Sequence, residues 1–273
     1  MMSPSLQGCL DWGPDATGST RAVGLMRIGL SVIALVRFGA ELAPFAAETL
    51  LALILGLVFF LVATLALIGR NARVSIGLLG AMILGFYGLT QMGIGLQGWN
   101  HHHVYILGIA CFFLSMSDCG KSYSWDRWQA LKEPGGPLPE EGALWGQRLI
   151  ALQMSALYLW TAIDKTDRAF LSGERLEQTF VWSYSGRALE MLLLFPPLLA
   201  AMAVAVVLVE YFLAFAILTK RYRTVAVTLA LPLHAVFYLL LPVSTYSATM
   251  IILYLAILDP KTVRTITDKM HST

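Results

Sequence analysis

Lys165 is the side chain with the clearest capacity for chemistry, because it directly follows a long uncharged segment. Residues 149–163 carry no charge, and the charged run 164–168 begins immediately after them. In a strongly apolar chain, an ionisable group facing the interior of a helix bundle is a candidate functional group. A lysine amine can serve as a general base where desolvation lowers its pKa from about 10.4 toward about 7–8. The alternative is that the side chain only extends to the lipid headgroups.

Three consecutive histidines, at residues 101–103, form a second group of this kind. Consecutive side chains on a helix point about 100° apart, so the three rings cannot all bind one tetrahedral metal ion. A pair of histidines separated by three residues, which would suit a metal on a helix, is missing. We expect no metal site. The histidines either cap a helix at the membrane interface or include a catalytic group.

Two further ionisable side chains, Glu210 and His234, lie inside apolar segments. Glu210 is expected to form a buried ion pair with Arg27 or Arg37, or to be protonated, and its role is interpreted as structural. His234 follows Pro232, whose missing N–H leaves the carbonyl four residues earlier without its helical donor. His234 is therefore compatible with a structural hydrogen bond and with a functional role.

The composition indicates a membrane protein. Of 273 residues, 57% are hydrophobic and 13% are charged, against about 25% charged in soluble domains. Apolar runs long enough to cross a bilayer as helices recur along the chain, which predicts an all-α, polytopic membrane bundle. The net charge of +2 argues against a nucleic-acid partner, and the three cysteines form no CxxC pair that would indicate a disulfide framework or a zinc site.

Eight apolar runs predict eight membrane-spanning helices. Lysine and arginine collect in alternate connections, and the positive-inside rule then places both termini in the cytoplasm. Trp99, Lys165 and Tyr246 are thereby assigned to one external face. The predicted spans are 22–43, 49–68, 75–97, 102–117, 144–163, 196–218, 224–241 and 245–258.

Two long connections interrupt the predicted bundle. Residues 118–143 are expected to be an irregular cytoplasmic loop. Residues 164–195 face outside, and the mixture of aromatic and charged residues at 170–184 predicts a short helix in the membrane interface. The host membrane is interpreted as a bacterial inner membrane. The complete organisation is a cytoplasmic segment 1–20, a bundle 21–260 and a cytoplasmic tail 261–273.

Short motifs along the chain, taken in order, resemble the vitamin K-dependent γ-carboxylase-like proteins, the group with the horizontally transferred transmembrane (HTTM) domain. The resemblance runs from about residue 21 to about residue 260. Each motif alone has little specificity, and their order and spacing give the resemblance its weight. The motifs are Arg27-Ile28-Gly29, the Asn/His segment 100–108, Tyr158-x6-Lys165 with Leu171 and Gly173 downstream, Glu210, and His234.

The resemblance implies an enzyme that uses a reduced lipid quinone. In the family's animal carboxylase, the lysine of the Tyr-x6-Lys element deprotonates vitamin K hydroquinone, and this role maps onto Lys165. His103 matches a histidine that supports catalysis. The implied cofactor is a reduced quinone of the vitamin K or menaquinone type, with oxygen and carbon dioxide as co-substrates. The implied partners are the lipid bilayer and a secreted peptide or protein.

Residues expected at the same depth and on the same side as Lys165 form the predicted quinone site, where aromatic rings can stack on a flat quinone. The expected cofactor-binding residues are Trp99, Asn100, His102, Tyr105, Tyr158, Trp160, His234 and Tyr246, and the expected structural charges are Arg27 and Glu210.

Two other functional classes are kept as alternatives. One is a non-catalytic membrane scaffold or maturation partner for a secreted peptide. The other is a small-solute transporter, which ranks lower because no inverted repeat is evident in the sequence. A structural pairing of Lys165 with Asp164 or Asp167 is a separate alternative to its role as a base.

Overall fold

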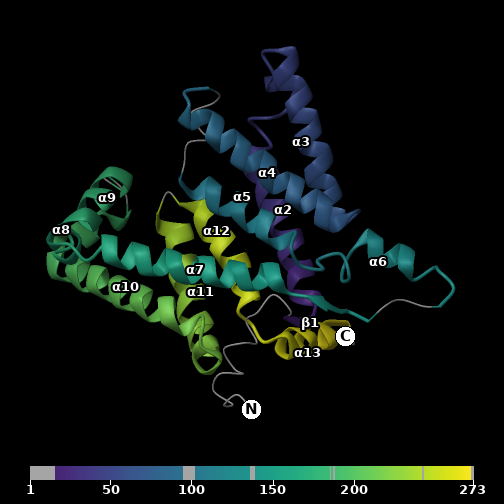
Figure 1. Cartoon of the computed structure of the whole chain (residues 1–273). Coiled ribbons are helices and arrows are strands. Elements are labelled where there is room, and N and C mark those ends of the chain that lie inside the picture. The colour runs from purple at the N-terminus through teal and green to yellow at the C-terminus, as the bar shows by residue number, and fades with distance from the viewer. Residues whose placement is uncertain are drawn as a thin grey trace. The chain divides into compact units, whose positions relative to one another are not determined.

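The computed structural model describes residues 16–94, 102–135, 139–184, 186, 188–241 and 243–271. Across this part of the chain the regular structure is helical apart from one small sheet (Figure 1). The chain forms two compact units, residues 1–150 with 245–273 and residues 151–244. The first unit contains the helices near both termini, and the second contains Lys165 and Glu210.

Long apolar helices form most of the first unit. At the start of α3 (Leu50–Ile68), the Thr49 hydroxyl accepts a hydrogen bond from the Ala52 N–H, and Gly69 ends the helix with a φ of +74°. Strand β1 (Thr17–Ser19) pairs antiparallel with β2 (Glu141–Ala143). The remaining elements are α2 (Arg21–Phe38), η1 (Pro44–Ala46), α4 (Ala72–Gln91), α5 (His102–Leu114), α6 (Trp125–Ala130), the start of α7 (Trp145–Asp164), most of α12 (Ser244–Leu253), η5 (Tyr254–Ala256) and α13 (Pro260–His271).

The second unit begins within α7 and contains two long helices after it. The ion pair of Lys165 with Glu210 and a hydrogen bond of Ser155 join α7 to α10 (Pro196–Ala216), and α8 (Arg168–Leu171) and α9 (Glu174–Tyr184) lie against α10 (Figure 1). Phe170, Ala203 and Val207 form a buried apolar cluster that packs α8 against α10. The other elements are η3 (Ala188–Leu194), η4 (Lys220–Tyr222) and α11 (Arg223–Leu240).

Four helical segments are long and apolar enough to cross a membrane: α3, α4, α10 and the segment 220–240 that contains α11. The prediction of an all-α membrane protein is therefore confirmed. A helix overlaps each of the eight predicted spans, yet eight crossings stay a prediction. α2 carries three arginines, and the 13 residues of α5 extend only about 20 Å, against a hydrocarbon core of about 30 Å.

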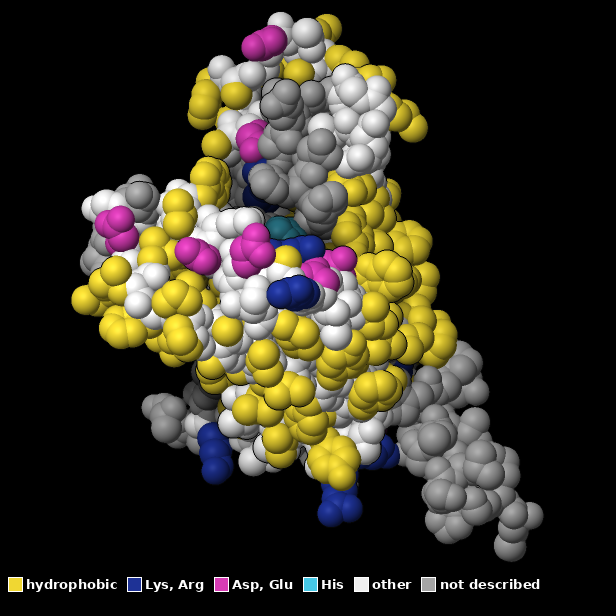
Figure 2. All heavy atoms as spheres, turned by 90° about the vertical axis from the view of Figure 1, so that its left-hand side faces the viewer, with side chains coloured by type: hydrophobic (Ala, Val, Ile, Leu, Met, Phe, Trp, Pro, Cys, Tyr) yellow, Lys and Arg dark blue, Asp and Glu magenta, His cyan; other side chains and the backbone are white. Residues whose placement is uncertain are grey.

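The surface of the second unit is suited to lipid. Figure 2 shows a face covered largely by hydrophobic side chains, with acidic and basic side chains across its middle and further basic side chains at its lower edge. Lys220 and Arg221 are exposed at the connection between α10 and α11. Exposed apolar side chains cover both helices: Leu198, Val204, Leu208, Phe215, Leu229, Val236 and Leu239. Such an apolar surface is stable in contact with acyl chains.

The two long connections contain regular structure. The expectation that residues 118–143 are irregular is wrong, because α6 and β2 form there. Ser124 caps α6 by accepting a hydrogen bond from the Arg127 N–H, and β2 obtains its partner from the distant strand β1, which local sequence does not signal. Within the connection 164–195, α9 is amphipathic, with Phe180 buried and Trp182 exposed.

Arg27 joins three segments of the first unit. Its side chain is fully buried, and a buried guanidinium requires hydrogen-bond acceptors. It donates at 2.5–3.2 Å to the backbone carbonyls of Ala66, Leu67, Cys119 and Tyr123. Carbonyls in the last turn of α3 lack helical donors, so they accept from Arg27. The ion pair expected between Glu210 and Arg27 or Arg37 is wrong, since Arg37 pairs with Glu41 and Glu210 pairs with Lys165.

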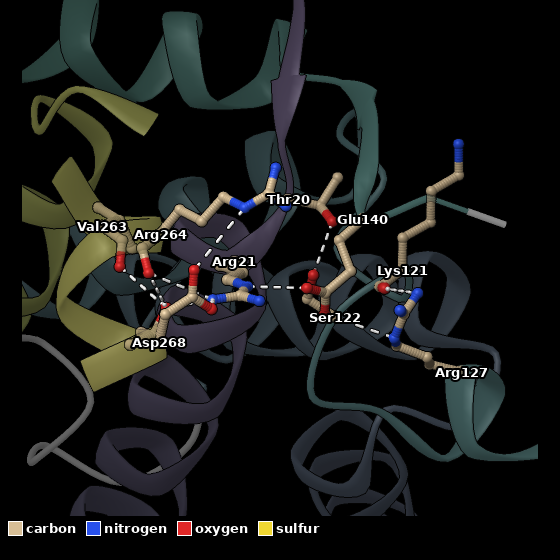
Figure 3. Close-up of polar contacts among 10 residues, drawn as sticks. Thr20, Arg21, Lys121, Ser122, Arg127, Glu140, Val263, Arg264 and Asp268 are labelled. Carbon is tan, nitrogen blue, oxygen red and sulfur yellow. Dashed lines mark hydrogen bonds and ion pairs between the residues drawn. The ribbon is translucent and has the colours of Figure 1, made fainter. Parts of the chain in front are cut away.

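Arg21 makes a second polar junction in the first unit, at the start of α2 (Figure 3). Its Nε donates to Glu140 at 2.7 Å, and its Nη1 donates to Thr267 at 2.6 Å and to Asp268 at 2.5 Å. These contacts hold α13 and the segment before β2 against the start of α2.

Replacing Arg27 by methionine should destabilise the protein, because four carbonyls lose their donor. We expect a loss of about 3 kcal/mol or more in the free energy of unfolding. Arg27→Lys should lie between wild type and Arg27→Met, because one ammonium reaches fewer carbonyls than a planar guanidinium. Thermal unfolding in detergent measures the effect, with the exposed Arg70→Met as the matched control. Equal melting temperatures for wild type and Arg27→Met would contradict the role of Arg27.

Candidate functional site

One face of α7 carries the polar residues of the candidate site. Ser155, Tyr158, Ala162 and Lys165 follow one another at spacings of three and four residues, which places them on one side of a helix. Tyr158 and Lys165 are two turns apart, about 10.5 Å along the axis. The Tyr-x6-Lys motif therefore places both side chains on the same face of α7.

α7 stops just before Lys165 and the chain turns into α8. The Lys165 N–H still bonds to the Thr161 carbonyl at 3.0 Å, and the Thr166 hydroxyl bonds back to the Ala162 carbonyl at 2.6 Å. Asp167 then starts α8 by accepting a hydrogen bond from the Phe170 N–H at 2.7 Å. Lys165 is thus fixed at the exact point where one helix ends and the next begins.

α10 brings Glu210 to this face of α7. The helix starts with two prolines, which suit the first turn. Ala203, Val207, Glu210 and Ala214 lie on its buried side. The Ser155 hydroxyl donates to the Ala214 carbonyl and fixes α7 against α10 one turn beyond Glu210. Glu210 is therefore held inside the helix contact and is not free to reach solvent.

Lys165 and Glu210 form a buried ion pair. Lys165 Nζ lies 2.5 Å from Glu210 Oε1, and the side chains are 24% and 2% exposed. The Phe170 ring centroid lies 5.8 Å from the same nitrogen, within the range of a cation–π contact. The other carboxylate oxygen, Oε2, is buried and accepts no hydrogen bond within the described part of the chain. The pair thus combines a reachable nitrogen with an enclosed acceptor.

A second hydrogen-bonded pair joins the same face of α7 to α11. The Tyr158 hydroxyl and His234 Nε2 are 2.6 Å apart, and both side chains are buried. Ala226, Ala230 and His234 occupy the buried stripe of α11, which brings the imidazole to Tyr158. A hydrogen bond was one of the two interpretations of His234, and its partner is the hydroxyl of Tyr158.

The predicted site residues fall into two groups. Lys165, Tyr158 and His234 belong to the second unit, together with Glu210. His103 and Tyr246 belong to the first unit, where their rings are 4.9 Å apart. Tyr105, in the same unit, lies against Tyr87 at 6.0 Å.

Trp160, although on α7, is 71% exposed, on the opposite side of the helix from Tyr158. His102 begins α5, but its side chain lies outside the description, and Trp99 and Asn100 lie outside the described residues.

Three contacts of Lys165 and its neighbours are absent from the sequence-based prediction. Glu210 was expected to have an arginine partner, Phe170 was assigned only to an interfacial helix, and the Thr166 hydroxyl lies 3.1 Å from the Tyr211 hydroxyl. The one sequence signal that could have predicted the pairing of Glu210 with Lys165 is the position of Glu210. It is the single acidic residue of an apolar helix that directly follows the Lys165 connection.

The arrangement is suited to proton transfer. A lysine–carboxylate pair shares one proton, which either the nitrogen or the oxygen can carry, and burial penalises the doubly charged form. The Tyr158–His234 pair is a second place where a proton can shift between two atoms. In the described residues no group of three or more His, Cys, Asp or Glu side chains could hold a metal ion.

Comparison with known protein families identifies a match. The model of the HTTM domain matches residues 37–261, most of the chain. No curated protein and no solved structure matches the chain. The matched range contains Tyr158, Lys165, Glu210 and His234 and begins after Arg27. The resemblance to the HTTM group is therefore confirmed.

The energetic coupling of Lys165 to Glu210 can be measured by a double-mutant cycle. Lys165→Met leaves a buried carboxylate unpaired and should cost about 3–5 kcal/mol of stability. Glu210→Gln should cost less, because the remaining ammonium is partly exposed, and the double variant should recover much of the loss.

The matched control is the exposed pair of Arg175 and Asp167, whose atoms are 2.6 Å apart. A cycle with Arg175→Met and Asp167→Asn should give a coupling below about 1 kcal/mol. A Lys165–Glu210 coupling no larger than that of the control pair would show that the buried contact contributes little.

Proposed function

The chain belongs to the HTTM domain family, and from this premise we propose that it is a membrane enzyme in which Lys165 takes a proton from a reduced lipid quinone. The observation that carries the proposal is the ion pair of Lys165 and Glu210. A base that deprotonates a hydroxyl must be reachable by its substrate, and it must first be free of its own proton. The 24% exposure of Lys165 meets the first need, and the buried Glu210 meets the second.

The proton balance of the proposed step involves three atoms. The ammonium of Lys165 passes a proton to Glu210 Oε1, which leaves an amine and a carboxylic acid. The amine nitrogen then uses its electron pair to accept the proton of the quinol hydroxyl, whose O–H bond breaks with its electrons left on oxygen. The site ends with one proton more than it began with. General-base catalysis of this kind contributes about 10²–10⁴-fold to a rate.

The residues present fit a quinol hydroxyl. Glu210 Oε2 is a buried oxygen with no hydrogen-bond partner in the described part of the chain, so it is available to accept a hydrogen bond. Phe170 and Tyr211 bring aromatic surface to Lys165 and Thr166, which favours a flat apolar ring. When bound, the reduced quinone with oxygen would supply the strong base that removes a glutamate γ-proton, before carbon dioxide is added to a secreted peptide or protein.

His103 matches the histidine that supports catalysis in the family motif, and this role stays a prediction. Its ring lies against Tyr246, so the two side chains form a small aromatic surface in the first unit. Tyr105, two residues further along α5, lies on another face of the helix and contacts Tyr87. The proposed activity is on the external side of the membrane, with both termini in the cytoplasm.

Two substitutions of Lys165 test the proposed base. Lys165→Arg keeps a cation for Glu210 but cannot release its proton, so it should be stable and should lose at least about 100-fold of the activity. Lys165→Met should be inactive and less stable. Menaquinol oxidation and carbon dioxide incorporation into peptide are measured beside thermal stability, with Lys220→Arg as the control for a conservative change at an exposed lysine.

An active Lys165→Arg protein would remove Lys165 as the base. The ion pair would then be structural, and the alternative of a scaffold or maturation partner for a secreted peptide would replace the enzyme.

The proposed orientation can be tested with single cysteines in a background lacking Cys9, Cys111 and Cys119. Ser244→Cys should react with a membrane-impermeant maleimide added to intact cells. Lys220→Cys, at the connection between α10 and α11, should react only after the membrane is opened. Both positions are exposed, so a difference in labelling between the two cysteines reports the side of the membrane and not burial. Labelling of Lys220→Cys in intact cells would reverse the orientation.

A further inference from the structure

A cavity of about 360 Å³ lies in the first unit, among residues that the proposed function does not use. It is formed by the start of α4, the segment after α5, and α6. Its size falls within the range of about 300–1,000 Å³ that is usual for small-ligand sites. The charged side chains in its lining are Arg73, Asp118, Lys121, Asp126 and Arg127.

Asp126 is held by the start of α4 and forms no ion pair with Arg73 or Lys121 in the described part of the chain. Its two carboxylate oxygens accept hydrogen bonds from the backbone N–H groups of Asn71 and Ala72, each at 2.9 Å. These are the first donors of α4, so the charge of Asp126 is balanced by the helix terminus.

Asp118 is the counter-charge that Arg73 and Lys121 share, whereas Arg127 pairs with Glu140 at 3.4 Å. Its Oδ2 lies 3.1 Å from Lys121 Nζ, and its Oδ1 lies 3.5 Å from Arg73 Nη1. Partial burial alone would raise the pKa of Asp118, but the hydrogen bond from the Ala143 N–H and the Lys121 ammonium hold that pKa below its usual range. One carboxylate therefore faces two cations, which leaves an excess of positive charge.

Arg73 and Lys121 each have more N–H donors than the contacts described for them use. Arg73 has five N–H groups and contacts the Ser115 carbonyl and Asp118. Lys121 has three and contacts the Glu141 carbonyl and Asp118. In Figure 3 the Lys121 side chain extends away from the contacts of Arg21 and Glu140. A guanidinium beside an ammonium is a common arrangement for holding a phosphate group.

α6 carries the features of a segment that lies at a membrane surface. Trp125 and Trp128 are exposed, with ring centroids 4.6 Å apart, and Leu131 is exposed after them. Lys132 Nζ lies 3.1 Å from the centroid of the Trp128 ring. Tryptophan is enriched at membrane–water interfaces, and basic clusters beside membrane helices attract anionic lipid. A phosphate group bound at the membrane–water interface is most simply that of a lipid headgroup.

We propose that this cavity binds the phosphate group of an anionic phospholipid, held by Arg73 and Lys121, while Trp125 and Trp128 anchor α6 in the headgroup layer. Free phosphate has the same chemistry, and the exposed tryptophans favour the lipid. The site is independent of the quinol chemistry proposed for Lys165.

The test compares the full chain in nanodiscs of phosphatidylcholine alone and of phosphatidylcholine with phosphatidylglycerol. Wild type should melt about 5 °C higher with the anionic lipid. Arg73→Gln and Lys121→Gln should each lose part of this rise, and the double variant should lose nearly all of it. Each single variant leaves Asp118 with one cation, so the fold is retained and the melting temperature in phosphatidylcholine alone verifies this.

Arg70→Gln is the matched control, because Arg70 is exposed three residues before Arg73 and is not part of the cavity lining. It should keep the full rise. Inorganic phosphate added to wild type in detergent distinguishes the sources. Stabilisation by phosphate, with no effect of phosphatidylglycerol, would overturn the lipid assignment. The proposal also fails if the double variant keeps the rise, or if Arg70→Gln loses as much as the double variant.

Discussion

The second unit depends on one constraint, which is that the carboxylate of Glu210 is buried between helices and must be compensated. A carboxylate in such surroundings is costly unless a cation and hydrogen bonds accompany it. Lys165 supplies the cation at 2.5 Å. This requirement fixes how α7 and α10 face each other, because Lys165 can reach Glu210 only from the side of α7 that also carries Ser155 and Tyr158. The contacts of Ser155 with Ala214 and of Tyr158 with His234 then follow from the same helix faces.

The same constraint gives the site its chemistry. In water, a lysine and a glutamate are simply two independent ions. In the apolar contact of α7 with α10, the charged pair and its neutral form are closer in free energy, because each charge loses its hydration. Lys165 is also positioned where α7 ends, so the nitrogen is reachable although the carboxylate is not. The combination of an enclosed acceptor and a reachable nitrogen distinguishes this pair from the exposed pair of Arg175 and Asp167, which has no such asymmetry.

Part of this arrangement could be predicted from the sequence. Apolar runs fix the positions of the helices, and the seven-residue spacing fixes Tyr158 and Lys165 on one face, because both are properties of a single segment. The partner of Glu210 could not be predicted, since it lies 45 residues away and depends on which helices pack together. Arg27 illustrates the same difficulty. Its charge suggests a carboxylate as the partner of the Arg27 guanidinium, whereas the carbonyls at the C-terminus of α3 are equally suitable hydrogen-bond acceptors. The pairing of β1 with β2 also depends on distant segments.

The central claim is that the proton of the Lys165–Glu210 pair moves when the quinol binds. Infrared difference spectroscopy of the purified protein in lipid measures the protonation state of a buried carboxyl group directly. Addition of menaquinol should produce a carbonyl stretching band of a protonated carboxylic acid, with loss of a carboxylate band, and Glu210→Gln should lack both changes. A spectrum in which wild type binds menaquinol while Glu210 keeps its carboxylate bands would contradict the account.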